Sequence, residues 1–175
     1  MRAKWHKVVP SGEPARSPEG DLARSGERQG TRRVFTGEYR HSVDEKGRLA
    51  VPARFRAQLD DGAFVSRWID GCLAIFPRRE WDDLAEKVRA LPIADAGARM
   101  FQRFLFGGAF EVVLDRQGRL VVPSGLREWA SLGSEAVVVG ARDHAEVWSP
   151  DRWDALSREI ESPDALAQHL TGLGI

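Results

Sequence analysis

An arginine directly follows a glycine at two related places in this 175-residue sequence. Arg48 and Arg119 each stand in the motif Asp-x-x-Gly-Arg-Leu-x-Val-Pro, and every matched position lies 71 residues from its counterpart. The planar guanidinium group of arginine can donate two parallel hydrogen bonds, which suits phosphate oxygens and the edge of guanine. A rigid turn that presents such side chains is a candidate for reading a groove of a nucleic acid.

The same motif also allows a purely structural role for its arginines. Arg48 could fold back onto Asp44, and Arg119 onto Asp115, so that each pair braces a turn. The sequence alone leaves both roles open. The first copy favours binding because it is rich in positive charge. Four basic residues fall within eleven positions: Lys46, Arg48, Arg54 and Arg56.

Each copy predicts the same local structure, namely a strand, a tight turn, a second strand and a short helix. Gly47 and Gly118 would supply the positive φ that such a turn usually needs. Pro52 and Pro123 would end the second strand, because proline has no N–H to donate, and they suit the first position of a helix. The residues expected to be buried are Phe35, Tyr39, Val43, Leu49, Val51, Phe55 and Leu59 in the first copy, and Phe110, Val112, Leu114, Leu120, Val122, Leu126 and Ala130 in the second.

The rest of the pattern predicts an α+β fold. Further strands are expected over residues 63–66, 72–76, 136–139 and 145–148, and further helices over residues 79–91, 95–106, 149–160 and 164–170. Trp81 and Trp153 lie at equivalent places, 72 residues apart, so the duplication extends beyond the motif. The predicted parts are a disordered basic leader (1–33), a first unit (34–78), a helical linker (79–107), a second unit (108–150) and C-terminal helices (151–175).

Charge is balanced over the chain but not along it. Residues 1–33 carry a net charge of +4, and residues 34–175 carry a net charge of −4. A nucleic-acid-binding protein with an acidic body must gather its positive charge on one face, or multiply that face by oligomerisation. Bulk charge therefore argues against DNA binding, and the local basic cluster around Arg48 argues for it.

Other classes of function find little support in the sequence. The four histidines are scattered without the spacing of metal ligands, and neither a Walker A loop nor a nucleophile elbow is present. We therefore expect that the protein is not an enzyme and that it binds neither a metal nor a cofactor. The single Cys72 cannot form an internal disulfide, and no apolar run approaches the length that spans a membrane. These features fit a cytoplasmic protein.

The doubled motif resembles the MraZ family of bacterial transcriptional regulators. The resemblance runs from about Val34 to Ile160. It includes the opening Phe35-Thr36-Gly37-Glu38-Tyr39, the segment Leu73-Ala74-Ile75-Phe76-Pro77 with Trp81, and the pair Val147-Trp148 with Trp153. The family pattern begins almost at Phe35, so a mis-assigned translation start, with the true start near Val34, is a hypothesis for the leader.

The resemblance implies a fold and a function. The fold would be two tandem swapped-hairpin units of the SpoVT-AbrB type that form a pseudo-twofold barrel. The function would be sequence-specific binding of double-stranded DNA at repeated G-rich promoter boxes, which represses a cell-division and cell-wall operon. The protein would be a nucleoid-associated homo-oligomer that assembles as a ring. An antitoxin-like protein-interaction module with the same hairpin fold is the alternative.

The first copy supplies most of the expected DNA contacts. Arg48 is expected to be the principal one, and the supporting residues are Lys46, Arg54 and Arg56. Arg119 and Arg116 are the equivalents in the second copy. That copy has lost charge, because Gln117 stands where the first has Lys46 and Gly125 stands where it has Arg54. The second copy is therefore expected to be mainly architectural.

Overall fold

The computed structural model describes residues 34–162, together with Ala167 and Leu170. Contacts divide the chain into two units, Met1–Arg32 and Arg33–Ile175, and all described residues belong to the second. The predicted disordered leader lies outside the described residues. The same holds for the predicted last helix, over residues 164–170, except for Ala167 and Leu170.

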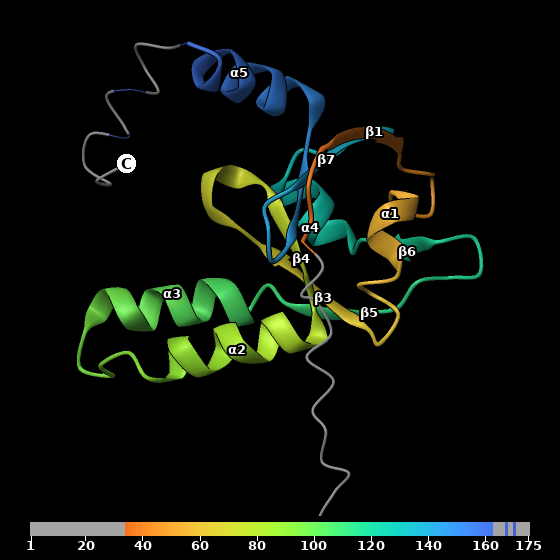
Figure 1. Ribbon diagram of the computed structural model, residues 1–175. Helices are drawn as coiled ribbons and strands as arrows, with labels where there is room; N and C mark the ends of the chain where they lie inside the picture. Colours follow the sequence, from red (N-terminus) through yellow and green to blue (C-terminus); the bar gives the residue numbers. More distant parts are fainter. Residues whose placement is uncertain (1–33, 163–166, 168–169, 171–175) are drawn as a thin grey trace, which may run out of the picture. The chain divides into compact units, whose positions relative to one another are not determined.

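The described elements are short strands interspersed with helices (Figure 1). In chain order they are β1 (Glu38–Ser42), β2 (Arg48–Ala50), α1 (Ala53–Arg56), β3 (Ala63–Arg67), the 3₁₀-helix η1 (Ile69–Gly71), β4 (Leu73–Pro77), α2 (Arg78–Arg89), α3 (Ala96–Phe106), β5 (Phe110–Val112), β6 (Arg119–Val121), α4 (Ser124–Trp129), β7 (Glu135–Gly140), β8 (Ala145–Trp148) and α5 (Pro150–Ile160). The predicted mixture of helices with antiparallel strands is confirmed.

Several predicted boundaries shift by a few residues. The helix of the first copy ends at Arg56 rather than near Leu59, and hydrogen-bonded turns carry the chain on to Gly62. Pro52 and Pro123 precede α1 and α4 as N-cap residues and do not occupy the first helical position. Asp95 caps α3 by accepting a hydrogen bond from the backbone N–H of Ala98 at 2.7 Å.

The two copies of the motif interleave in the sheets. The six-stranded sheet has the order β1-β7-β8-β4-β3-β5, and β2 pairs with β6 in a separate two-stranded sheet. All these pairings are antiparallel. The first strand of each copy therefore pairs with a strand of the other copy, β1 with β7 and β5 with β3. Neither copy completes a sheet from its own strands, because a lone hairpin cannot bury its apolar face.

The main core lies between the two sheets. Leu49 faces Leu120 in the β2–β6 pair, and both side chains are fully buried. Phe55 of α1 packs edge-on against Phe35, with ring centroids 5.0 Å apart. Burying a side chain of this size stabilises a fold by about 1.5–3 kcal/mol relative to leaving it exposed. The predicted apolar faces of the second strands and short helices are thus confirmed.

Phe110 corrects the predicted core. It was expected on the buried face, but 47% of its surface is exposed. Its counterpart Tyr39 packs on Phe55, with ring centroids 5.3 Å apart. Phe110 begins the edge strand β5, and the shorter Leu126 stands where the first copy has Phe55. The second copy therefore offers no aromatic ring for Phe110 to pack against in the same way.

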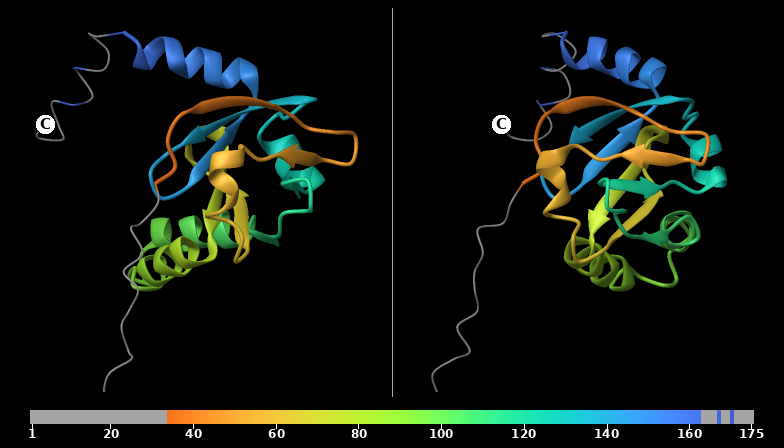
Figure 2. Two further views of the ribbon diagram at one scale, coloured as in Figure 1. Left: turned by 45° about the vertical axis from the view of Figure 1, so that its right-hand side comes forward. Right: turned by 90° about the vertical axis from the view of Figure 1, so that its right-hand side faces the viewer.

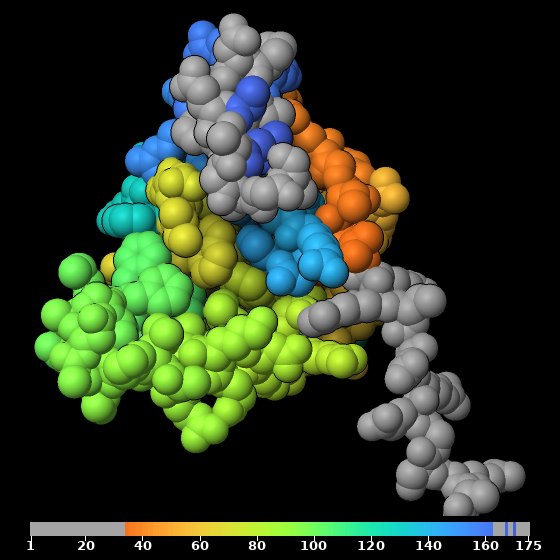
Figure 3. Space-filling model, turned by 60° about the vertical axis from the view of Figure 1, so that its left-hand side comes forward, coloured from red at the N-terminus to blue at the C-terminus, as the bar shows by residue number. Residues whose placement is uncertain are grey.

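Helices cover the outer face of the six-stranded sheet (Figure 2). α2 and α3 lie side by side over β3 and β4, where Trp81 stacks on Phe64 with ring centroids 4.9 Å apart. α5 lies over β7, where Trp153 contacts Trp148. The tryptophans Trp81 and Trp148 are buried in these packing clusters, as expected for core residues. In Figure 3 the surfaces of α2 and α3 form the lower part of the view, in yellow-green and green.

Candidate functional site

The pairing of β2 with β6 brings the two Asp-x-x-Gly-Arg turns to the same two-stranded sheet. Arg48 lies opposite Val121, and Arg119 lies opposite Ala50. A guanidinium nitrogen of Arg119 lies 3.7 Å from a carboxylate oxygen of Asp44, so the turns are close enough to interact. We call residues 44–48 the first turn and residues 115–119 the second turn.

The aspartate organises each turn through its side chain. In the first turn, Oδ1 of Asp44 accepts hydrogen bonds from the backbone N–H groups of Lys46 at 3.0 Å and Arg48 at 2.9 Å. The backbone N–H of Gly47 donates to the carbonyl of Asp44 at 2.8 Å. Gly47 has a φ of +74° and Gly118 has a φ of +73°, as the sequence predicted. The second turn repeats these bonds around Asp115.

The arginines of both turns bond to the aspartates. Nε of Arg48 donates to Oδ2 of Asp44 at 2.6 Å. Nε and Nη2 of Arg119 both donate to Oδ2 of Asp115, at 2.9 Å and 2.8 Å. The bracing of each turn by its arginine, which the sequence left open as a structural role, is therefore present in the isolated chain. It does not bury the arginines, because the side chains of Arg48 and Arg119 remain 33% and 25% exposed.

These contacts favour the ionised form of both aspartates. The hydrogen bonds from Arg119, first from its side chain and then from its backbone, lower the pKa of Asp115 to about 2. The backbone and side chain of Arg48 lower the pKa of Asp44 in the same direction. Each turn therefore carries a fixed negative charge beside a fixed positive charge at neutral pH. The unbalanced positive charge must come from neighbouring residues.

The other predicted site residues fall into two groups. Lys46, Arg54 and Arg116 are exposed near the turns. Nη1 of Arg54 donates to the hydroxyl of Tyr39 at 3.0 Å, which holds the arginine along β1. In contrast, Arg56 is half-buried, and its Nε donates to the backbone carbonyl of Val51 at 2.9 Å. The structure thus places Arg56 behind the first copy's strand rather than free on the surface.

Sequence reasoning missed Arg127. It stands 71 residues after Arg56, and its Nε donates to the carbonyl of Val122 at 3.2 Å in the same way. Comparing the two copies position by position, rather than counting charge, would have found it. Beside the second turn, Arg56 and Arg116 line a hollow of about 260 Å³ together with Asp60 and Asp115.

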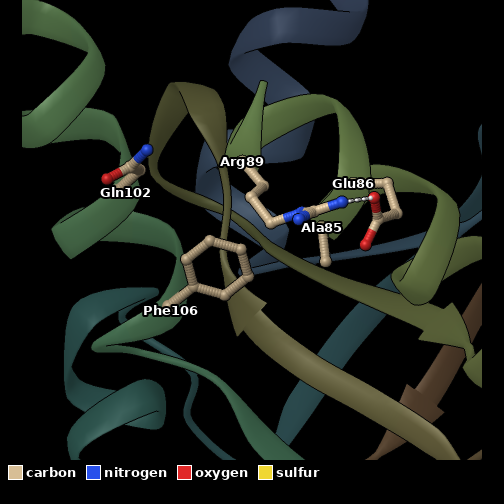
Figure 4. A pocket seen from close by; sticks show the side chains of 5 residues that line it. All are labelled: Ala85, Glu86, Arg89, Gln102 and Phe106. Atoms are coloured by element: carbon tan, nitrogen blue, oxygen red, sulfur yellow. Dashed lines mark hydrogen bonds and ion pairs between the residues drawn. The ribbon is translucent and has the colours of Figure 1, made fainter. Parts of the chain in front are cut away.

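A second hollow, of about 370 Å³, lies between α2 and α3 (Figure 4). Ala85, Glu86, Arg89, Gln102 and Phe106 line it. Glu86 and Arg89 form an ion pair with each other, and Gln102 donates to the carbonyl of Val88. These polar groups are thus engaged within the helical pair, and nothing in the hollow resembles a catalytic or anion-binding arrangement.

His144 is a buried titratable group that the sequence did not indicate. Its ring stacks on Phe76, its Nδ1 lies 2.6 Å from Asp143, and its Nε2 lies 3.6 Å from Glu146. Burial lowers the pKa of His144, but the carboxylates of Glu146 and Asp143 outweigh it, so the pKa is raised. Within the described part of the chain, no group of residues could hold a metal ion. No described helix is long and apolar enough to cross a membrane.

Comparison with known proteins identifies close relatives. A family model described as "MraZ protein, putative antitoxin-like" matches residues 34–104 and again residues 105–171. The transcriptional regulator MraZ of Roseiflexus sp. (strain RS-1) is 47% identical over 141 residues, which are 80% of this chain and 99% of that protein. The protein of the same name from Moorella thermoacetica is 44% identical over 143 residues, which are 81% of this chain and 100% of that protein.

Proposed function

This chain belongs to the MraZ family, and from that premise we propose that it is a DNA-binding transcriptional repressor. One observation carries the proposal. The β2–β6 pair brings both glycine–arginine turns together, so Arg48 and Arg119 share a small part of an otherwise acidic unit with the exposed Lys46 and Arg116. Such concentration is what a DNA-binding protein without a basic body requires.

Arg48 is proposed as the principal contact. It commits Nε to Asp44, which fixes the plane of the guanidinium group, and arginine has further N–H donors on its terminal nitrogens. Arg119 donates to Asp115 through two nitrogens and lies near Asp44 as well, so more of its N–H donors are used within the turns than is the case for Arg48. Lys46 and Arg54 are proposed as phosphate contacts of the first turn, and Arg116 as the equivalent on the second.

The arrangement around these contacts is also part of the proposal. The exchange of strands between the copies supports a swapped-hairpin barrel with a pseudo-twofold axis. Exposed apolar residues, including Phe110 and Val113, support assembly of several chains into a ring. A ring would set several turns side by side on repeated G-rich boxes of the operon's own promoter. Multivalent binding would then raise a weak single contact to a useful affinity.

The description of the family as antitoxin-like favours a second function, in which the hairpin fold holds a protein partner. Under that function the exposed arginines would contact a polypeptide, and no duplex would be preferred. The two functions therefore differ in their salt dependence and in their preference for one DNA sequence.

The test uses the full chain and a fluorescent duplex from upstream of its own gene. We expect binding that is stronger than to a scrambled duplex of equal length, with an affinity that falls steeply as salt rises. Equal and weak binding to both duplexes would contradict the proposal. Recovery of one stoichiometric protein partner, together with no preference for the upstream duplex, would support the antitoxin-like function.

A further inference from the structure

Each turn glycine lies beneath an arginine of the other copy. A Cβ atom added to Gly47 would lie 2.8 Å from Nε of Arg127 and 2.9 Å from the carbonyl oxygen of Val122. A Cβ atom added to Gly118 would overlap the guanidinium group of Arg56. Only glycine allows an arginine to approach the backbone so closely. The two contacts have the same form although they join different copies.

Backbone hydrogen bonds close the same contact. The N–H of Val122 donates to the carbonyl of Gly47 at 2.8 Å, and Arg127 donates to the carbonyl of Val122. The N–H of Val51 donates to the carbonyl of Gly118 at 3.0 Å, and Arg56 donates to the carbonyl of Val51. One valine thus links each arginine to the glycine that the arginine covers.

Both copies have this contact, although they differ at other basic positions. Lys46 becomes Gln117 and Arg54 becomes Gly125, so the exposed charges of the first copy are lost in the second. The arginine that covers the opposite glycine is present in both copies and is half-buried in both. Half-burial and a hydrogen bond to a valine carbonyl, found in both copies, indicate a structural contact rather than a surface charge alone.

We propose that Arg56 and Arg127 are positioning residues, each holding the turn of the opposite copy in its binding geometry. Arg127 fixes the first turn and so orients Arg48, although it belongs to the second copy. Arg56 fixes the second turn and orients Arg119 in the same way. The part of the protein that contacts DNA is then the pair of turns, each held by an arginine of the opposite copy. We call the packing of Arg127 on Gly47 and of Arg56 on Gly118 the crossed contact. The orientation of Arg48 toward DNA rests on the proposed function, whereas the crossed contact does not.

Hydrogen exchange tests the crossed contact without DNA. Arg127→Met keeps most of the side chain's length and removes its donors. We expect the amides of residues 46–48 to exchange about two- to tenfold faster, the factor that one lost hydrogen bond represents, with residues 115–119 unchanged. Arg56→Met should produce the opposite pattern. Arg54→Met, an exposed change in the same helix α1, is the control and should alter neither turn.

Two results would overturn the proposal. One is faster exchange in the turn of the mutated copy with no change in the opposite turn. The other is no change in either turn. If Arg127→Met does not fold, Arg127→Lys replaces it, because lysine can still reach the carbonyl of Val122 but lacks a planar group to cover Gly47. The same crossed pattern at smaller amplitude is then expected, and its absence counts against the proposal.

DNA binding separates positioning from direct contact. Arg127→Met should weaken binding to the upstream duplex by about tenfold, the factor that 1.4 kcal/mol represents, and leave the salt dependence of binding unchanged. A direct phosphate contact would instead reduce the slope of log K against log salt by about one. A reduced slope would contradict the positioning role. If the wild-type chain binds no DNA at all, the proposed function fails, and the exchange experiment still decides the crossed contact.

Discussion

Gly47→Ala should destabilise the protein, while Gly125→Ala should not. At Gly47 the backbone φ is +74°, a conformation that costs an alanine about 1–2 kcal/mol. The new methyl group would also displace Arg127 from the carbonyl of Val122 and cost a hydrogen bond worth about 0.5–1.5 kcal/mol. Together these effects predict a loss of about 1.5–3.5 kcal/mol in the free energy of unfolding.

Gly125 provides a matched control within the other copy. It lies in α4, and a Cβ atom added there would meet nothing within 4 Å beyond its chain neighbours and the backbone of its own helix. Alanine is favoured over glycine in a helix by up to about 1 kcal/mol, so Gly125→Ala should be neutral or stabilising. The same chemical change is therefore predicted to destabilise the protein at Gly47 and not at Gly125.

Urea unfolding at a fixed protein concentration measures both changes, and thermal unfolding provides an independent check. For a chain of this size, 1 kcal/mol corresponds to about 2–4 °C in Tm, so Gly47→Ala should lower Tm by roughly 3–14 °C. A Gly47→Ala protein as stable as wild type would refute the reasoning, because both the φ value and the covering arginine would then be unimportant. Equal losses at Gly47 and Gly125 would refute it as well.

Three further outcomes follow from the structure. Because the folded pKa of His144 is raised above 6.5, its contribution to stability should be complete below that value and disappear as pH rises through the raised pKa; His144→Gln should abolish this part of the dependence of Tm on pH. Because the folded pKa of Asp115 is lowered from 3.8 to about 2, the stability difference between wild type and Asp115→Asn should shrink as pH falls from about 4 to 2 in urea titrations. Sedimentation at micromolar concentration and physiological salt should give a mass well above the 19.5 kDa of one chain, and a monomer there would contradict the proposed ring.

The repeat and its alternating apolar residues predicted the local structure well. Leu49 and Leu120 are buried because each lies on the inward face of a short strand, and a period of two residues reveals that face. Gly47 and Gly118 have positive φ because the turn between the strands needs it. These features depend on neighbours in the chain, so a sequence pattern can carry them.

The contacts between copies could not be predicted in the same way. Nothing local to β1 shows that it pairs with β7, nearly 100 residues away, since that choice depends on the packing of both copies together. Arg56 was predicted as a DNA contact because it is a charged residue near a basic turn. The covering of Gly118 by Arg56 becomes visible only once the second copy is in place. His144 had no ligand-like spacing to other histidines, although Asp143 and Glu146 flank it in sequence.

Binding of the upstream duplex by Arg48→Ala, measured beside Asp44→Ala, tests the central claim most directly. If Arg48 reads DNA, folded Arg48→Ala should lose about 1–3 kcal/mol of binding free energy for each engaged subunit, the usual worth of a bidentate base contact. Arg48→Lys should keep salt-dependent, non-specific binding and lose the preference for the upstream sequence. If Arg48 only braces the turn, any loss of affinity in Arg48→Ala should come with a loss of stability, and Asp44→Ala, which also removes two backbone hydrogen bonds of the turn, should lose more of both. Wild-type affinity in a folded Arg48→Ala protein would contradict the account.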